Sequence, residues 1–248
     1  MPNARFWALY VSTYTLICGA SLLFFPERAP FVHFSAGDKI WVQFAGMVFV
    51  AYSYFNVVLF RERLDDLLTV TFVCQAVFAV ATAVTAFVLK SVGLGVVAAV
   101  LLIGTIGSSL SSMVKADSGR ASPATPMPRT RFWNLYVAIY TGFFGVGPLV
   151  LPRTVVALFG FPYPDGLWVR FVGMSFLVLS YYNIVAYRNK GPQSAILSIL
   201  NVRIWFIAVL SWLALSHNLA IIYPIIATVI IGVVGTVLTY RKETHAMS

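Results

Sequence analysis

Residues 5–15 read RFWALYVSTYT and residues 131–141 read RFWNLYVAIYT, with eight of the eleven letters identical in order. Gly19 and Pro26 follow the first stretch as Gly145 and Pro152 follow the second, at the same offset of 126. Each stretch opens an apolar segment of about twenty residues, the length that a helix needs to cross the hydrocarbon of a bilayer. The sequence therefore predicts the same membrane-spanning helix twice.

The repetition continues through each half with a slightly larger offset. At an offset of 127 the matching residues are Asp38, Trp41, Val42, Phe44, Gly46, Met47, Ser53, Tyr54, Asn56 and Arg61 with Asp165, Trp168, Val169, Phe171, Gly173, Met174, Ser180, Tyr181, Asn183 and Arg188. Gly104 and Gly107 match Gly232 and Gly235 at an offset of 128. We predict a first four-helix repeat at residues 1–113, a cytoplasmic linker at 114–130 and a second four-helix repeat at 131–248.

Eight segments qualify as membrane spans, at residues 6–25, 40–60, 67–89, 92–113, 132–151, 167–187, 195–216 and 219–240. The chain is 60% hydrophobic and 10% charged, which leaves too few charges for the polar surface of a soluble protein. Because each half has an even number of spans, both halves enter the bilayer from the same side. The predicted fold class is an all-α polytopic membrane protein with eight transmembrane helices arranged as two parallel four-helix repeats.

The basic residues predict the orientation of these spans. Eleven lie on the side of the N-terminus, at Arg5, Arg61, Arg63, Lys115, Arg120, Arg129, Arg131, Arg188, Lys190, Arg241 and Lys242. Four lie beyond the opposite ends, at Arg28, Lys39, Lys90 and Arg153. Since Lys and Arg accumulate in cytoplasmic loops, we expect both termini in the cytoplasm and a multi-pass protein of the cell (inner) membrane.

Several functional classes lack support in the sequence. The basic residues are dispersed between apolar segments and form no patch with stacking aromatics, so nucleic acid is not an expected partner. Cys18 and Cys74 lie inside apolar segments without a CxxC spacing, and no metal site or cofactor is predicted. No HExxH, GxSxG or paired-carboxylate pattern identifies catalytic residues, so we favour a protein that is not an enzyme.

Arg203 is the most informative polar residue, because it lies about eight residues inside a predicted span, where a charge costs a few kcal/mol unless it is paired or hydrated. In one interpretation Arg203 binds a phosphate or carboxylate, and Asn201 and Gln75 donate hydrogen bonds to the same group. Gln75 is the repeat counterpart of Arg203. In the other, neighbouring backbone carbonyls and tyrosine hydroxyls satisfy it. Both interpretations remain open at this stage.

Two features lie at the opposite ends of the spans. Arg170, whose repeat counterpart is Gln43, is a further candidate for ligand binding, although beside Trp168 it is better placed to anchor the helix at the headgroups. Residues 152–160 carry apolar side chains in an outer loop, and we expect Val155 to Phe159 to form a short interfacial helix.

A layer of polar residues recurs in both halves. It consists of Tyr10, Tyr14 and Asn56 in the first half and of Tyr136, Tyr140 and Asn183 in the second. Tyr10 and Tyr14 are four residues apart and share a helix face. Because the layer occurs twice, we predict hydrogen bonds between helices rather than a single ligand site.

The second half contains VALFGFP at residues 156–162, VRFVG at 169–173 and Arg188 at the end of the following helix. In these residues it resembles a family of small bacterial four-helix membrane proteins known as DoxX-like. The first half departs from it, with Gln43 in place of Arg170. The resemblance implies a four-helix architecture and brings no catalytic residue with it.

The leading hypothesis is an integral membrane protein that binds or transports a small anionic or amphiphilic molecule, with Arg203 as the cationic anchor. The alternative is a non-catalytic membrane subunit or scaffold whose apolar faces pack against another protein or a second copy of the chain. A membrane enzyme acting on a lipid or a quinone is a third hypothesis. Membrane lipids are expected partners in all three.

Overall fold

The computed structural model describes residues 4–29, 34–62, 68–113, 128–158, 160–161, 166–188 and 193–245. In these residues the chain is helical and contains no strand. The long helices are α1 (Ala4–Phe24), α2 (Lys39–Glu62), α3 (Leu68–Val88), α4 (Val92–Met113), α5 (Pro128–Val150), α7 (Leu167–Arg188), α8 (Gln193–Ser216) and α9 (Ile222–His245). Shorter helical segments are η1 (Pro26–Arg28), η2 (Ala36–Asp38) and α6 (Pro152–Leu158).

All eight long helices within the described ranges are long and apolar enough to cross a membrane. Their outward faces carry large apolar side chains, such as Phe87, Phe143 and Leu215, that are 72% to 84% exposed. A soluble protein would bury such residues, whereas the hydrocarbon of a bilayer accommodates them. The predicted all-α polytopic membrane fold is confirmed.

The linker prediction needs a correction at its end, because α5 begins at Pro128 and not at residue 131. Proline suits the first turn of a helix, where its missing N–H leaves no bond unmade. The Glu243 carboxylate at the end of α9 accepts hydrogen bonds from the backbone nitrogens of Arg129 and Thr130, at 2.8 and 3.1 Å, and from the Thr130 hydroxyl at 2.6 Å. Residues 114–127 of the predicted linker lie outside the described residues.

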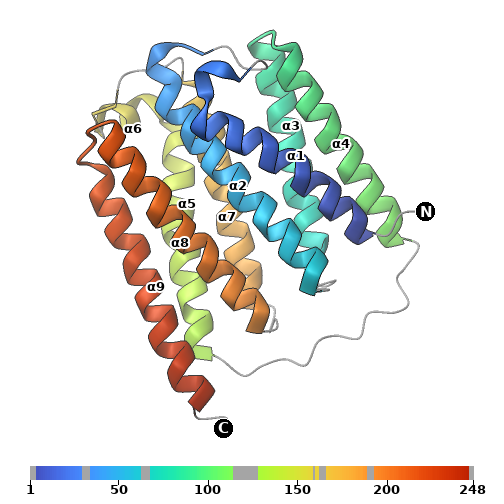
Figure 1. Ribbon diagram of the computed structural model, residues 1–248. Helices are drawn as coiled ribbons and strands as arrows, with labels where there is room; N and C mark the ends of the chain where they lie inside the picture. The colour runs from blue at the N-terminus through green and yellow to red at the C-terminus, as the bar shows by residue number, and fades with distance from the viewer. Residues whose placement is uncertain are drawn as a thin grey trace.

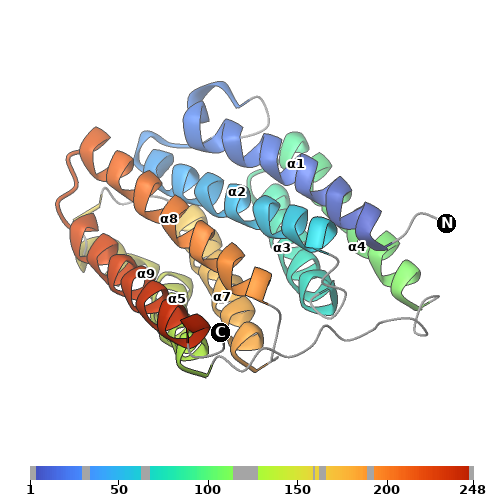
Figure 2. The same cartoon turned by 60° about the horizontal axis from the view of Figure 1, so that its bottom comes forward.

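The helices form one bundle in which α2, α7 and α8 join the two halves (Figures 1 and 2). Helix α1 packs on α2 and α4, and α5 packs on α7 and α9. Helix α3 packs on α4, and α8 packs on α9. Across the halves, α2 contacts α7 and α8, and α3 contacts α7. The start of α1 and the end of α9 lie at the lower ends of these helices in Figure 1, and α6 lies at the upper ends.

Glycines permit the closest helix contacts in both halves. A Cβ atom added to Gly46 of α2 would stand 2.7 Å from the carbonyl oxygen of Gly19 in α1. A Cβ atom added to Gly173 of α7 would stand 2.7 Å from the carbonyl oxygen of Gly145 in α5. Small residues drive helix association in membranes by letting backbones touch, so these pairs set the separation of α1 from α2 and of α5 from α7.

Three side-chain hydrogen bonds fasten α8 to α2. The Asn201 amide nitrogen donates to the Tyr54 hydroxyl at 2.8 Å, and Trp205 Nε1 donates to the backbone oxygen of Met47 at 3.3 Å. Just beyond the end of α8, His217 Nε2 lies 2.7 Å from Gln43 Oε1. These bonds lie on the α2 side of α8, which leaves the opposite side of α8 facing α5 and α9.

Candidate functional site

Arg203 is the eleventh residue of α8, and its side chain is only 3% exposed. Its Nη1 donates to the Thr236 hydroxyl at 2.5 Å and to the Gly232 carbonyl at 3.3 Å, both in α9. Its Nη2 donates to Asn134 Oδ1 at 2.8 Å and to the Trp133 carbonyl at 3.5 Å, both in α5. The guanidinium therefore joins α8 to α5 and α9.

All four acceptors of the guanidinium are uncharged, so they satisfy its N–H groups without neutralising its charge. Its fifth N–H, at Nε, is buried and has no hydrogen-bond partner. A buried charge is stable in a protein when an opposite charge or several hydrogen bonds compensate it. Arg203 has the hydrogen bonds, but among the residues that the structure describes no carboxylate is bonded to its guanidinium.

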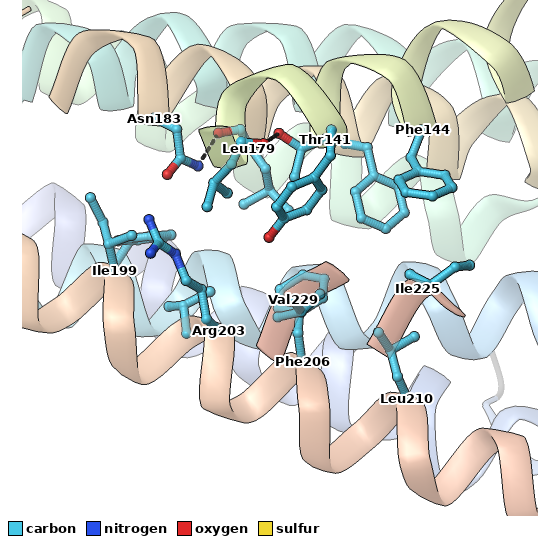
Figure 3. Close-up of a pocket in the computed structure, with 15 residues that line it drawn as sticks. Thr141, Phe144, Leu179, Asn183, Ile199, Arg203, Phe206, Leu210, Ile225 and Val229 are labelled. Carbon is cyan, nitrogen blue, oxygen red and sulfur yellow. Dashed lines mark hydrogen bonds between the residues drawn. The ribbon is translucent and has the colours of Figure 1, made fainter. Parts of the chain in front are cut away.

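A cavity begins at Arg203 and runs between α5, α7, α8 and α9. Eleven of its fifteen lining residues are apolar, and the other four are Tyr140, Thr141, Asn183 and Arg203. None of the fifteen is acidic. Figure 3 shows Asn183 and Arg203 at one end, pointing toward one another from facing helices, while Phe144, Leu210 and Ile225 lie at the other end. The cavity is thus polar at one end and apolar along the rest of its length.

A second cavity lies next to the apolar end of the first. Phe144, Phe176, Leu210 and Ile225 line both spaces, and the lining of the second includes Leu158 of α6. With the open space at their mouths included, the two measure about 520 and 730 Å³. Both spaces are mostly apolar, and the second lies nearer the α6 end of the bundle.

Asn183 contributes an unused acceptor to the polar end of this space. Its side chain is 5% exposed, its Nδ2 donates to the Leu179 carbonyl at 2.8 Å, and its Oδ1 has no partner. The equivalent Asn56 in the first half donates likewise to the Tyr52 carbonyl, but its Oδ1 accepts a hydrogen bond from Gln75 at 3.4 Å. In the second half the residue that matches Gln75 in the sequence is Arg203. Its Nη atoms are bonded to α5 and α9, which leaves the Asn183 acceptor free.

The structure does not bring the four predicted ligand-binding residues together. Asn201 is exposed and bonds Tyr54 of α2, because residues two apart on a helix lie on nearly opposite faces. Gln75 is buried in α3 against α2, and Arg170 is exposed near the start of α7. Of the four, only Arg203 lines the cavity.

The tyrosine rings of the predicted polar layer contact one another within each half, at a steep angle between the ring planes. The Tyr10 and Tyr14 ring centroids are 4.9 Å apart, and those of Tyr136 and Tyr140 are 5.5 Å apart. Tyr136 donates to the Thr228 carbonyl of α9 at 3.4 Å, which is a bond between helices as predicted. Tyr14 is 45% exposed, whereas Tyr140 lines the cavity.

Two residues that hold Arg203 were not identified from the sequence, although a signal was present. Asn134 is the polar residue of RFWNLY where the first half has Ala8 in RFWALY. The half that carries arginine at position 203 in place of glutamine also carries its acceptor, Asn134. Thr236 lies four residues after Gly232 on the same face of α9, and helical spacing alone could have grouped them.

A polar contact between the halves was also missed. The Tyr182 hydroxyl donates to Thr71 Oγ1 at 2.8 Å, and the Tyr52 hydroxyl donates to the Thr71 carbonyl at 3.3 Å. These bonds join α7 and α2 to α3. The sequence repeat instead matches the neighbouring Tyr181 with Tyr54, and Tyr181 is 41% exposed. The spacing of Ser175, Val178 and Tyr182 along one face of α7 would have identified the buried tyrosine.

The first half contains a space of about 580 Å³, with the open space at its mouth included, that is lined without a charge. Its lining includes Tyr14, Thr15, Cys18 and Leu101, which match Tyr140, Thr141, Phe144 and Val229 at sequence offsets of 126 and 128. Since Gln75 does not line it, this cavity offers neither a cation nor an amide from that position. The two halves therefore differ in the chemistry of equivalent spaces.

Outside the spans, two features lie near the α6 end of the bundle. The predicted short helix forms as α6, while Phe159 lies outside the described residues and the position of α6 in the headgroups stays a prediction. Burial, and then the charge of Lys39, lower the pKa of His217 below its ordinary value. Within the described ranges no three His, Cys, Asp or Glu side chains gather in a way that could hold a metal ion.

No protein-family model matches the chain, and neither a curated protein nor a solved structure is significantly similar to it.

Proposed function

We propose that this integral membrane protein binds a small amphiphilic anion in the cavity of its second half, with the anionic group at Arg203 and the apolar part along α5, α7, α8 and α9. The observation that carries the proposal is a guanidinium that is 3% exposed, has no carboxylate bonded to it within the described part of the chain, and stands at one end of an apolar cavity.

The charge of Arg203 supports an anionic ligand. Arginine at membrane depth costs about 2.5 to 3.5 kcal/mol by insertion scales, and more where no counter-ion is near. Its four hydrogen bonds to α5 and α9 lower this cost and hold the guanidinium in place. A fixed cation in a low-dielectric site favours an anion strongly, because Coulomb attraction is weakened little by solvent there.

The rest of the cavity supports a ligand with a hydrocarbon part. Phe144, Phe206, Leu210 and Ile225 offer no hydrogen bonds, so a fully polar anion would leave this space without a suitable occupant. Burying hydrocarbon there contributes about 0.8 kcal/mol per CH₂ group taken from water. Ligand sites that are mostly apolar with a few polar groups at one end typically orient amphiphiles in this way.

We further propose that the two halves are parallel repeats related by an axis along the membrane normal. The matching contacts of Gly19 with Gly46 and of Gly145 with Gly173 support this relationship. The distribution of Lys and Arg supports cytoplasmic termini. A place in a bacterial inner membrane belongs to the proposal as well. A distant relationship to DoxX-like proteins is part of the same proposal and rests on the sequence resemblance alone.

The test is native mass spectrometry of protein extracted in a mild detergent, comparing the wild type with Arg203→Gln. Glutamine already occupies the equivalent buried position 75, so we expect Arg203→Gln to insert and fold. We expect a co-purifying anion in the wild type and a drop in its occupancy of about tenfold or more in the variant, the effect of losing one charge-assisted contact. Arg203→Lys should restore part of it, because an ammonium cannot reproduce the guanidinium geometry.

Arg170→Gln is the matched control, because Arg170 is an exposed arginine that does not line the cavity. We expect its ligand content to equal that of the wild type. Equal ligand content in wild type, Arg170→Gln and folded Arg203→Gln would contradict the proposal and favour a subunit without a ligand.

A further inference from the structure

We infer that the ligand of this cavity carries a hydrogen-bond donor, an amide N–H or a hydroxyl, directly beside its anionic group. This inference rests on the proposed function and names the chemistry of the headgroup. Two buried atoms that line the cavity lack partners, the Asn183 Oδ1 acceptor and the Arg203 Nε donor. One headgroup with an anionic acceptor and a neighbouring donor satisfies both.

Burial makes the unused acceptor of Asn183 costly. The residue is 95% buried, as its 5% exposure shows, and an acceptor left without a hydrogen bond at such a site keeps its full desolvation cost. Asn183 Nδ2 is already bonded to the Leu179 carbonyl of its own helix, which fixes the amide with Oδ1 free. A ligand that brings a donor removes this cost, whereas a plain carboxylate does not.

The first half shows how the same acceptor is satisfied when no ligand is needed. There Asn56 Oδ1 receives a hydrogen bond from Gln75 at 3.4 Å. In the second half the residue equivalent to Gln75 is Arg203, whose Nη1 and Nη2 are bonded to α9 and α5. The exchange of glutamine for arginine thus adds a cation and frees an acceptor at the same point.

Both groups line the polar end of one cavity. Asn183 of α7 and Arg203 of α8 point toward one another across that end (Figure 3). A donor bonded to Asn183 Oδ1 and an anion at Arg203 would therefore belong to the same end of one ligand. An acyl chain attached to this headgroup would follow the apolar residues Phe206, Leu210 and Ile225. N-acyl amino acids and 2-hydroxy fatty acids share this chemistry.

Two matched pairs of probes test the inference on protein in phosphatidylcholine nanodiscs. N-dodecanoylglycine has an amide N–H where its ester counterpart, O-dodecanoylglycolate, has an oxygen atom. 2-Hydroxytetradecanoate and tetradecanoate differ only by a hydroxyl. We expect the wild type to bind the donor-bearing member of at least one pair about tenfold more tightly, the scale of one good hydrogen bond to a buried acceptor. The pair that shows the difference identifies the donor.

Variants separate this inference from the proposed function. Asn183→Leu, of similar shape, should abolish the preference within the pair while keeping affinity for the member without a donor. Asn56→Leu is the control, because Asn56 Oδ1 is already bonded, and it should leave the preference unchanged. Equal binding within both pairs by the wild type would overturn the inference without any variant. If Arg203→Gln then still weakens the binding of all four probes, the proposed anion site stands without the inferred donor. If Arg203→Gln weakens the binding of none of them, the proposed function and the inference are both wrong.

Discussion

Gly46 of α2 lies against Gly19 of α1 so closely that an added Cβ atom would stand 2.6 Å from the backbone nitrogen of Leu23 and 2.7 Å from the Gly19 oxygen. Backbone atoms cannot rotate away as a side chain can, so any Cβ atom here must push the two helices apart. The pair occurs within the segment that recurs as Gly145 and Gly173, where the same approach is seen.

Gly46→Ala should therefore destabilise the protein by about 1 to 3 kcal/mol, the cost of overpacking a tight contact. Gly173→Ala should behave in the same way. Gly95→Ala is the control, because nothing lies within 4 Å of a Cβ atom at that position and alanine favours the helix. Thermal unfolding in detergent measures all three. A Gly46→Ala protein as stable as Gly95→Ala would show that α1 and α2 do not touch there.

The contact between α7 and α3 predicts a loss of stability in Tyr182→Phe. The change keeps the ring, which stacks on Phe55 with centroids 5.2 Å apart, and removes the hydroxyl bonded to Thr71. We expect a loss of about 0.6 kcal/mol, the average measured for hydrogen bonds between membrane helices, and at most about 1.7 kcal/mol. Tyr187→Phe, at a position 40% exposed, should leave the unfolding temperature unchanged. Equal effects of the two variants would rule out this bond as a link between the halves.

His217 should make stability depend on pH. Its pKa in the folded protein is lowered by burial and by Lys39, while the unfolded chain keeps the ordinary value of 6.5. The unfolded state therefore binds the proton of His217 more tightly than the folded state does. Above pH 6.5 the side chain is neutral in both states and does not lower the free energy of unfolding. As the pH falls from 6.5 toward the lowered pKa, the free energy of unfolding decreases. Both pH 7.5 and pH 5 lie about one unit or more from the ordinary pKa. Between them, we expect the unfolding temperature to fall further in the wild type than in His217→Gln. An identical loss in both proteins would assign the pH dependence to other groups.

The proposed orientation predicts which introduced cysteines can be labelled from outside the cell. Cys18 and Cys74 are only 5% and 1% exposed, so they contribute little background. Ala220→Cys, between α8 and α9, should react with an impermeant maleimide on intact cells. Lys242→Cys, near the end of α9, should react only after permeabilisation. The reverse pattern would overturn the cytoplasmic placement of the termini.

Local properties of the sequence were enough to predict the eight spans. A span needs about twenty apolar residues in a row, because its backbone groups must pair within the segment, and both requirements can be read from consecutive residues. The start of α5 was missed by three residues because it depends on Glu243, which is more than a hundred residues away in the sequence.

The buried charge of Arg203 could also be predicted from its depth in an apolar segment, but its partners could not. Asn201 is two residues away and bonds α2, whereas Asn134 and Thr236 come from α5 and α9 and converge on the guanidinium. Which face of a helix meets which neighbour is decided by packing over the whole bundle, and so is the space that packing leaves unfilled. The sequence by itself determined that a cation lies in the membrane, and only the tertiary structure decided that it stands with a free asparagine oxygen at the end of an apolar cavity.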